Sequence, residues 1–128
     1  MNLLDYMPFA QTLGLTISKA EADCVVGELE VTTALATTGK IMHGGAIMSV
    51  ADTLGAVGAF LNLPDGAKAT TTIESKTNFL GAAPVGRRVV ATTTPIHVGR
   101  RTSVWQTKLA LDDGKAVAIV TQTQMVLS

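Results

Sequence analysis

The sequence has 128 residues, enough to bury one core but too few for a second cofactor-binding unit, so we expect a single domain over residues 1–128. Apolar residues make up 47% and charged residues 16%, which excludes a disordered chain, and one cysteine, Cys24, excludes an internal disulfide. Ten basic residues balance ten acidic ones, so the net charge favours neither a nucleic-acid partner nor an anionic membrane surface.

The N-terminal quarter predicts a short helix and two strands. Residues 1–15 lack the basic segment, long apolar run and cleavage site of a signal peptide, so we expect a cytoplasmic protein. Apolar residues at roughly helical spacing over 3–13 predict a short helix, with Pro8 near its first turn. Residues 15–19 and 24–32 read as extended, and the second segment shows the alternation of a strand.

The central segment 44–63 predicts a long helix. Its apolar residues cover nearly the whole helical circumference, which indicates a helix buried on all sides. The length also suits a membrane span, but Asp52 stands in its middle and would cost about 2.5–3.5 kcal/mol at a bilayer centre. Because the following segments can bury the helix instead, we expect no membrane partner.

The remainder of the chain predicts strands. A turn at Pro64-Asp65-Gly66 precedes four segments rich in Thr, Val and Ile, and Asp112-Asp113-Gly114 is typical of a hairpin between the last two. These predicted strands are 69–79, 88–98, 102–111 and 115–126. We interpret them as a meander in an α+β fold, with an antiparallel sheet wrapped around one long central helix.

Two features of the central helix could take part in a chemical reaction. His43-Gly44-Gly45 opens it, and a helix start offers unpaired N–H groups that glycines leave accessible to an anion. Asp52 is the only ionisable residue between His43 and Asp65, and a carboxylate in an apolar helix needs a compensating partner or a cavity. Gly44 and Asp52 lie about 12 Å apart along one helix, so they share a site only if a second subunit brings an antiparallel helix.

Each of these residues also has an ordinary structural explanation. Paired glycines at a helix start are more often packing or turn devices, and a histidine there is usually a cap. For Asp52, a structural hydrogen bond and a functional role are both open. The residues alone therefore indicate an acid and a helix-end anion site, and no more.

A resemblance to a known family adds to this interpretation. KIMHGGA at 40–46, followed by Ala51-Asp52, resembles the hot-dog thioesterases related to the phenylacetate-pathway and 4-hydroxybenzoyl-CoA enzymes. The similarity extends over 72–80, 84–86, 96–101 and 104–106, and so covers nearly the whole chain from residue 25. It implies the hot-dog fold, hydrolysis of an acyl-CoA thioester, and a homodimer with composite active sites, arranged as a dimer of dimers.

The resemblance also implies roles for individual residues. Asp52 attacks the thioester or activates water, and the backbone N–H of Gly44 polarises the carbonyl. His43 orients the carbonyl region or holds the helix start. Thr72 is the best match for a hydroxyl that positions the attacking water, with Thr70 as the second choice.

The implied substrate contacts are less specific. Arginines near two loops match positions that bind coenzyme A phosphates, although a solvated turn explains them equally well, and Phe79 lines an acyl tunnel or fills the core. Thr37 stands where many relatives carry Asn or Gln, and Ala56 replaces a usual Ser or Thr. The predicted substrate-binding residues are Gly45, Thr37, Phe79, Arg87, Arg88, Arg100 and Arg101.

Hydrolysis is the leading interpretation because one carboxylate and oriented N–H donors suffice for it. The chain has no nucleotide-binding glycine motif and no His/Cys cluster of zinc spacing, so we expect no metal and no cofactor, coenzyme A being part of the substrate. The substrate is an aromatic or a short- to medium-chain acyl-CoA. The alternative is a non-catalytic acyl-CoA-binding or sensor protein on the same fold.

Overall fold

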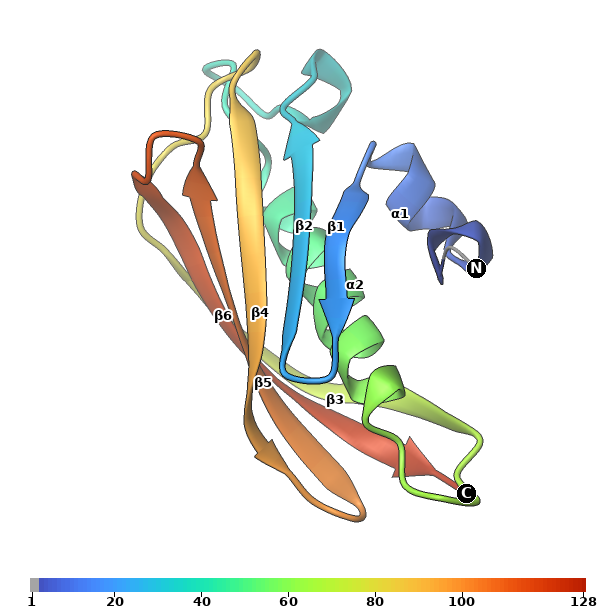
Figure 1. The fold of residues 1–128 in the computed structure, drawn as a ribbon. Coiled ribbons are helices and arrows are strands. Elements are labelled where there is room, and N and C mark those ends of the chain that lie inside the picture. Colours follow the sequence, from blue (N-terminus) through green and yellow to red (C-terminus); the bar gives the residue numbers. More distant parts are fainter. Residues whose placement is uncertain (1–2) are drawn as a thin grey trace.

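The computed structural model describes residues 3–128, in which a curved antiparallel sheet wraps around one long helix (Figure 1). Met1 and Asn2, part of the N-terminal segment predicted to lack a signal peptide, lie outside the described residues. In chain order the elements are η1 (Leu3–Tyr6), α1 (Pro8–Thr12), β1 (Thr16–Glu21), β2 (Cys24–Glu30), η2 (Thr33–Leu35), α2 (Gly44–Leu61), β3 (Ala69–Phe79), β4 (Arg88–Val98), β5 (Thr102–Leu111) and β6 (Ala116–Leu127). The predicted α+β architecture is confirmed.

The predicted helix over 3–13 is wrong as a single element, because the chain breaks it at Pro8. Proline disfavours helical backbone in the preceding residue, and Met7 accordingly has φ −127° and ψ 75°. Pro8 itself occupies the start of α1, where its missing N–H costs nothing. The result is a 3-10 turn, η1, followed by a five-residue helix.

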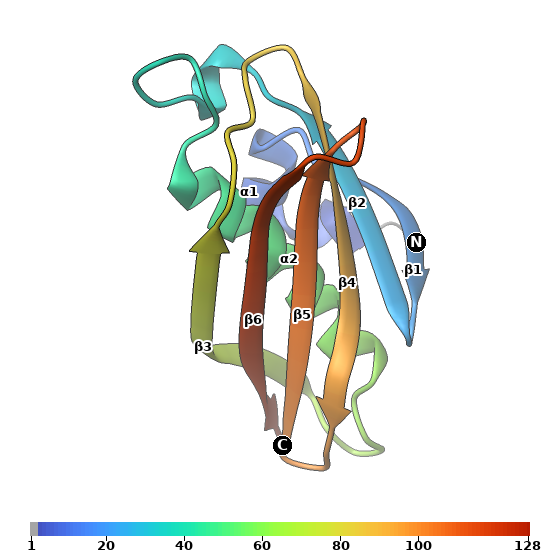
Figure 2. The same ribbon diagram turned by 90° about the vertical axis from the view of Figure 1, so that its left-hand side faces the viewer.

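The predicted four-strand meander is also wrong. The sheet order is β1-β2-β4-β5-β6-β3, so β4, β5 and β6 form a meander while β3 pairs with β6 at the far edge (Figure 2). The chain reaches that edge by crossing the concave face of the sheet through α2, and the loop after β3 then returns it to β2. Because β3 is an edge strand, its outer side has no partner strand among the described residues.

A β-bulge in β3 changes which side chains face the helix. The register shifts between Thr72, which pairs with Gln124, and Glu74, which pairs with Thr123. A bulge inserts one residue and reverses the subsequent alternation of faces. Thr72 and Phe79 therefore both face α2, although an even- and an odd-numbered residue of a regular strand point to opposite faces.

One face of α2 packs into the sheet, and two glycines allow a close approach there. A Cβ on Gly58 would lie 2.7 Å from the ring of Trp105, and one on Gly55 would overlap the amide of Gln122. The opposite face, which carries Met48, Asp52 and Phe60, is exposed, so the prediction of a helix buried on all sides is wrong for one chain.

The helix α2 is the one described helix that is long and apolar enough to cross a membrane, but half of its residues are buried within the protein. The core helix of a folded domain meets the same criteria of length and composition. Its packing against all six strands of the sheet accounts for its apolar sequence without a bilayer.

Candidate active site

A chain of hydrogen bonds connects the carboxylate of Asp52 to the interior of the sheet. The Thr72 hydroxyl donates to Asp52 Oδ1 at 2.6 Å, and Gln124 Nε2 donates to Thr72 Oγ1 at 2.5 Å. Thr70 Oγ1 then donates to Gln124 Oε1 at 3.1 Å. Asp52 is exposed, whereas Gln124 is fully buried. The carboxylate in this apolar helix therefore has a hydroxyl partner, Thr72, whose own position is fixed by the hydrogen bond from Gln124.

Gln124 was not among the predicted site residues. It lies on β6, where period-two alternation continues the buried face of Ala118 and Val120 through Gln122 to Gln124. Two glutamines on the apolar face of a strand are a signal that could have been noticed. Which of them reaches a site could not be deduced, since that depends on the pairing of β6 with β3.

The three residues of the HGG motif have different roles at the start of α2. His43 is the N-cap residue, and its Nδ1 accepts a hydrogen bond from the Gly45 N–H at 2.8 Å. A neutral His43 therefore carries its proton on Nε2. The Gly44 N–H has no acceptor within the described part of the chain. Of the two glycine amides, only that of Gly44 remains available to a ligand at the positive end of the helix dipole.

Phe79 forms a wall beside this amide. A Cβ on Gly44 would lie 3.2 Å from the edge of the Phe79 ring, and Phe79 as a whole residue is 54% exposed. Thr37 belongs to a tight turn before the helix, in which its N–H donates to Ile41 O at 2.8 Å. Within residues 3–128 the Thr37 hydroxyl has no hydrogen-bond partner, so nothing connects it to His43 or Asp52.

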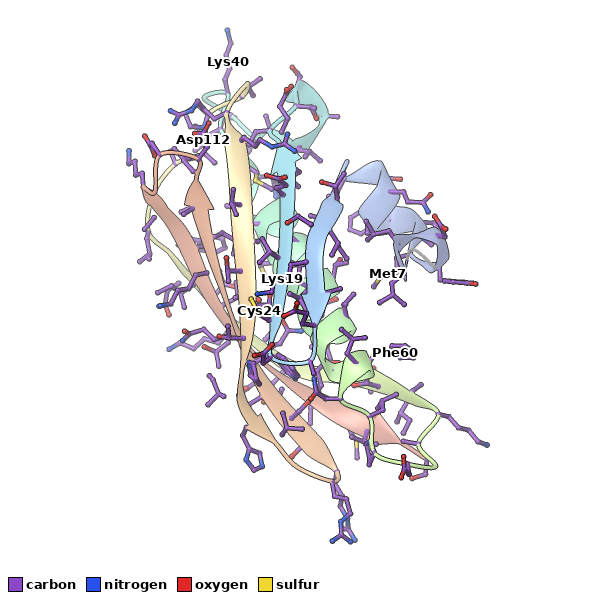
Figure 3. All side chains as sticks on the ribbon, viewed as in Figure 1. Met7, Lys19, Cys24, Lys40, Phe60 and Asp112 are labelled. Carbon is purple, nitrogen blue, oxygen red and sulfur yellow. The ribbon has the colours of Figure 1, made fainter. Side chains whose placement is uncertain are left out.

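The four predicted arginines fall into two groups at opposite ends of β4. Arg87 contacts Asp112 at 3.0 Å and Asp113 at 3.3 Å, at the end of the molecule that also carries Lys40 (Figure 3). Arg88 contacts Glu28 at 3.2 Å. Arg100 and Arg101 follow the other end of β4 and form no ion pair within residues 3–128.

The arginines of the first group, Arg87 and Arg88, form ion pairs with neighbouring carboxylates. Hydrogen bonds to Asp112 and then to Asp113 raise the pKa of the Arg87 guanidinium. The pKa of Asp113 is lowered, first by the Lys115 backbone N–H and then by Arg87. The strand between the groups has 11 residues and spans about 36 Å, so one ligand phosphate cannot contact both groups of one chain.

A cavity of about 440 Å³ begins one helical turn beyond Asp52, at Ala56 of α2. Ala56 and Phe60, one and two helical turns beyond Asp52, form one wall, and Thr70 forms another. The N-terminal segment with Leu3, Tyr6 and Met7 covers it, and Figure 3 shows Met7 and Phe60 on this side of the molecule. Its lining is almost entirely apolar, and its volume is typical of a small-molecule site.

One chain does not contain the whole predicted site. Gly44 and Asp52 belong to the same continuous helix, eight residues or about 12 Å apart, so a single carbonyl cannot contact both. In residues 3–128 no group of three or more His, Cys, Asp or Glu side chains is placed to hold a metal ion. The arrangement supplies a carboxylate, an oriented hydroxyl and a free backbone N–H, which are the groups for acid-base or nucleophilic chemistry on a carbonyl.

Comparison with known proteins agrees with this chemistry. A sequence model described as the thioesterase superfamily matches residues 39–118. The 1,4-dihydroxy-2-naphthoyl-CoA hydrolase of Listeria monocytogenes is 30% identical over 88% of this chain and 90% of its own length.

Solved structures extend the comparison to the fold. The crystal structure of a mutant of thioesterase PA1618 from Pseudomonas aeruginosa has a TM-score of 0.87 and 27% identity, covering 93% of this chain and 85% of that one. The P. aeruginosa protein is 34% identical over an aligned segment of 68% of this chain and 59% of the relative. AziG of S. sahachiroi has a TM-score of 0.88 and 26% identity, covering 94% of this chain and 96% of that one.

Proposed function

This chain belongs to the thioesterase superfamily and has the hot-dog fold, and from that premise we propose that it hydrolyses an acyl-CoA to the free acid and coenzyme A. The observation that carries the proposal is the exposed Asp52 carboxylate, which accepts a hydrogen bond from Thr72 and lies on a helix whose first N–H has no acceptor in residues 3–128. The proposal includes a cytoplasmic location and no cofactor besides the substrate's own coenzyme A.

Asp52 supplies the reactive group in either of two ways. As a general base, it takes a proton from water while the water oxygen bonds to the thioester carbonyl carbon. As a nucleophile, its oxygen bonds to that carbon, and water then hydrolyses the resulting anhydride. In both routes the carbon–sulfur bond breaks, and the coenzyme A thiolate leaves and takes up a proton. The Gly44 N–H stabilises the negative charge that develops on the carbonyl oxygen.

We propose that the complete site forms between two copies of the chain. The outer side of the edge strand β3 pairs with no strand of the described chain, and Ile73, Phe79 and Leu80 on or next to it are each more than half exposed. Pairing there with a second copy covers these side chains and allows two α2 helices to run antiparallel. Each Asp52 then approaches the partner chain's helix start, which gives two composite sites per dimer. A further pairing of dimers into tetramers remains a prediction.

An assay of thiol release tests the function. A panel of acetyl-, octanoyl-, benzoyl- and 1,4-dihydroxy-2-naphthoyl-CoA, with calorimetric binding measured in parallel, is expected to show turnover of at least one thioester. Binding of acyl-CoA with no thiol release from any member would instead favour the non-catalytic sensor, for which the missing hydroxyl at Ala56 is the structural argument.

We place the acyl group in the cavity beyond Asp52, because Ala56 and Phe60 continue the same helix face. Ala56→Leu is expected to lower kcat/KM for octanoyl- or benzoyl-CoA by about 10- to 200-fold, because the larger side chain takes up space in the hydrophobic pocket. Hydrolysis of acetyl-CoA should change little. Ala110→Leu is the matched control, because it makes the same change on the outer face of β5. Equal losses on all acyl lengths would argue against this placement.

Of the predicted phosphate-binding arginines, the proposal retains Arg100 and Arg101, which form no ion pair among the described residues. Alanine at either position is expected to raise KM for acyl-CoA about tenfold but not KM for a pantetheine thioester without nucleotide phosphates, because the lost contact is remote from the carbonyl. Arg88→Ala, which breaks the pair with Glu28, is the control. A KM increase for both substrates, or one confined to Arg88→Ala, would reject the assignment.

A further inference from the structure

The buried amide of Gln124 determines what the hydroxyl of Thr72 can do. A threonine hydroxyl has one proton to donate and lone pairs that accept. Gln124 Nε2 donates to Thr72 Oγ1, so the oxygen acts as acceptor toward the sheet, and its single proton is directed to Asp52 Oδ1. Thr72 is therefore oriented as a donor to the carboxylate rather than as a group that exchanges protons with water.

The orientation of the amide is itself determined. Gln124 has a carbonyl oxygen and an NH₂ group, and an inverted amide would present its oxygen to Thr72. The Asp52 carboxylate can only accept, so it takes the single proton of Thr72, and the Thr72 oxygen then requires the Nε2 donor on its side. Gln124 Oε1 faces Thr70 and accepts from its hydroxyl. Three side chains from two strands thus point their donors in one direction, toward Asp52.

We propose that Gln124 is a positioning residue for hydrolysis and that it acts through Thr72 on Asp52. The inference rests on the proposed role of Asp52 as base or nucleophile. With Oδ1 held by Thr72, the second carboxylate oxygen remains available to the substrate or water in one fixed direction. Loss of the amide frees the Thr72 hydroxyl to rotate, and a reacting group displaced by about 1 Å can lose 100-fold in rate.

The neighbouring Gln122 provides a matched control. Both glutamines are 0% exposed and lie two residues apart on the same face of β6. The Gln122 amide rests against Gly55 of α2 and has no hydrogen-bond partner within the described residues. Replacing either glutamine by methionine keeps the length of a buried side chain, but only the change at 124 removes a contact that leads to Asp52.

Gln124→Met is expected to lower kcat about 10- to 100-fold at unchanged KM, whereas Gln122→Met retains kcat within about twofold. Equal effects of the two variants, or a normal kcat in Gln124→Met, would overturn the proposal. A double-mutant cycle gives a second readout: in the Asp52→Asn background, Gln124→Met should have no further effect on the residual rate. A full additional loss there would mean that Gln124 does not act through Asp52.

Gln124→Glu keeps the proposal testable if the methionine variant does not fold. A protonated glutamic acid donates its O–H to Thr72 as the amide does, whereas an ionised carboxylate only accepts and draws the Thr72 proton away from Asp52. Turnover of this variant is therefore expected to fall with rising pH in a range where the wild type does not fall. A pH profile parallel to that of the wild type would contradict the proposal.

The outcomes also separate this inference from the proposed function. If Asp52→Asn retains full turnover, the role of Asp52 fails and the inference fails with it. If Asp52→Asn is inactive while Gln124→Met is fully active, only the positioning role of Gln124 is wrong.

Discussion

Replacing Asp52 by asparagine is expected to lower thioester turnover at least about 100-fold, while coenzyme A still binds. An amide neither takes a proton from water nor forms an acyl anhydride, and general-base catalysis alone contributes about 10²–10⁴-fold. The amide oxygen can still accept the Thr72 hydrogen bond that Oδ1 accepts at 2.6 Å, so the shape of the site is kept. Steady-state thiol release gives the rate, and calorimetry with coenzyme A reports the pocket.

Circular dichroism must accompany these measurements, because a folding defect also lowers the rate. Thr53→Ser is a suitable control: Thr53 is the next residue on α2, and its hydroxyl donates to the Ser49 carbonyl, a bond that serine can reproduce. Turnover of folded Asp52→Asn close to the wild-type rate would mean that another group carries the chemistry.

Activity is also expected to return when two differently disabled subunits are combined. An Asp52→Asn chain lacks the acid, and a Gly44→Pro chain lacks the N–H, so each homodimer has two dead sites. In a heterodimer with composite sites, one site receives both lesions and the other receives neither. The rate per heterodimer should therefore be about half that of the wild type, if the two sites are independent.

The local structure suits the proline substitution. Proline is tolerated at the first position of a helix, and His43 before it already has the extended backbone, φ −63° and ψ 137°, that a residue preceding proline prefers. Gly44→Ala is the matched control, since it adds a Cβ near the Phe79 ring but keeps the N–H. The alanine homodimer should retain most of the activity that the proline homodimer loses.

Two different affinity tags allow the heterodimer to be isolated and its folding checked. Absence of recovery in verified heterodimers would show that acid and amide act within one chain or that Gly44 is not the donor. Because about 12 Å separates them along α2, the second explanation would then be preferred.

Local patterns in the sequence predicted most of the elements. The start of α2 at Gly44 and the bounds of β3, β4 and β5 agree with prediction, because helix starts, turn residues and β-branched runs depend on a few neighbouring residues. The split at Pro8 was missed, although the restriction that proline imposes on Met7 is itself local.

Long-range pairing could not be predicted in the same way. Nothing within 69–79 specifies that β3 joins β6 rather than β4, since that depends on α2 crossing the whole sheet. Gln124 was overlooked for this reason, as it reaches Thr72 only through that pairing. The two groups of arginines could be distinguished only once the structure placed Arg87 beside Asp112 and Arg88 beside Glu28.

The bulge between Thr72 and Glu74 determines that side chains from both halves of β3 face the active-site residues of α2. Thr72 contacts the acid, and Phe79 contacts the helix start, so in a composite dimer one strand serves one active site with its first half and the other site with its second half. Removal of the extra residue at the bulge would let Thr72 and Glu74 pair regularly with the consecutive residues Gln124 and Thr123, and both Thr72 and Phe79 would still face α2. Insertion of a further residue between the bulge and Phe79, without a second bulge, would instead turn Phe79 away from Gly44 while Thr72 stayed in place. In evolution, an insertion between Thr72 and Phe79 would therefore alter the two halves of the catalytic apparatus unequally, whereas loss of the extra residue at the bulge, or an insertion in the α2–β3 loop, would spare both.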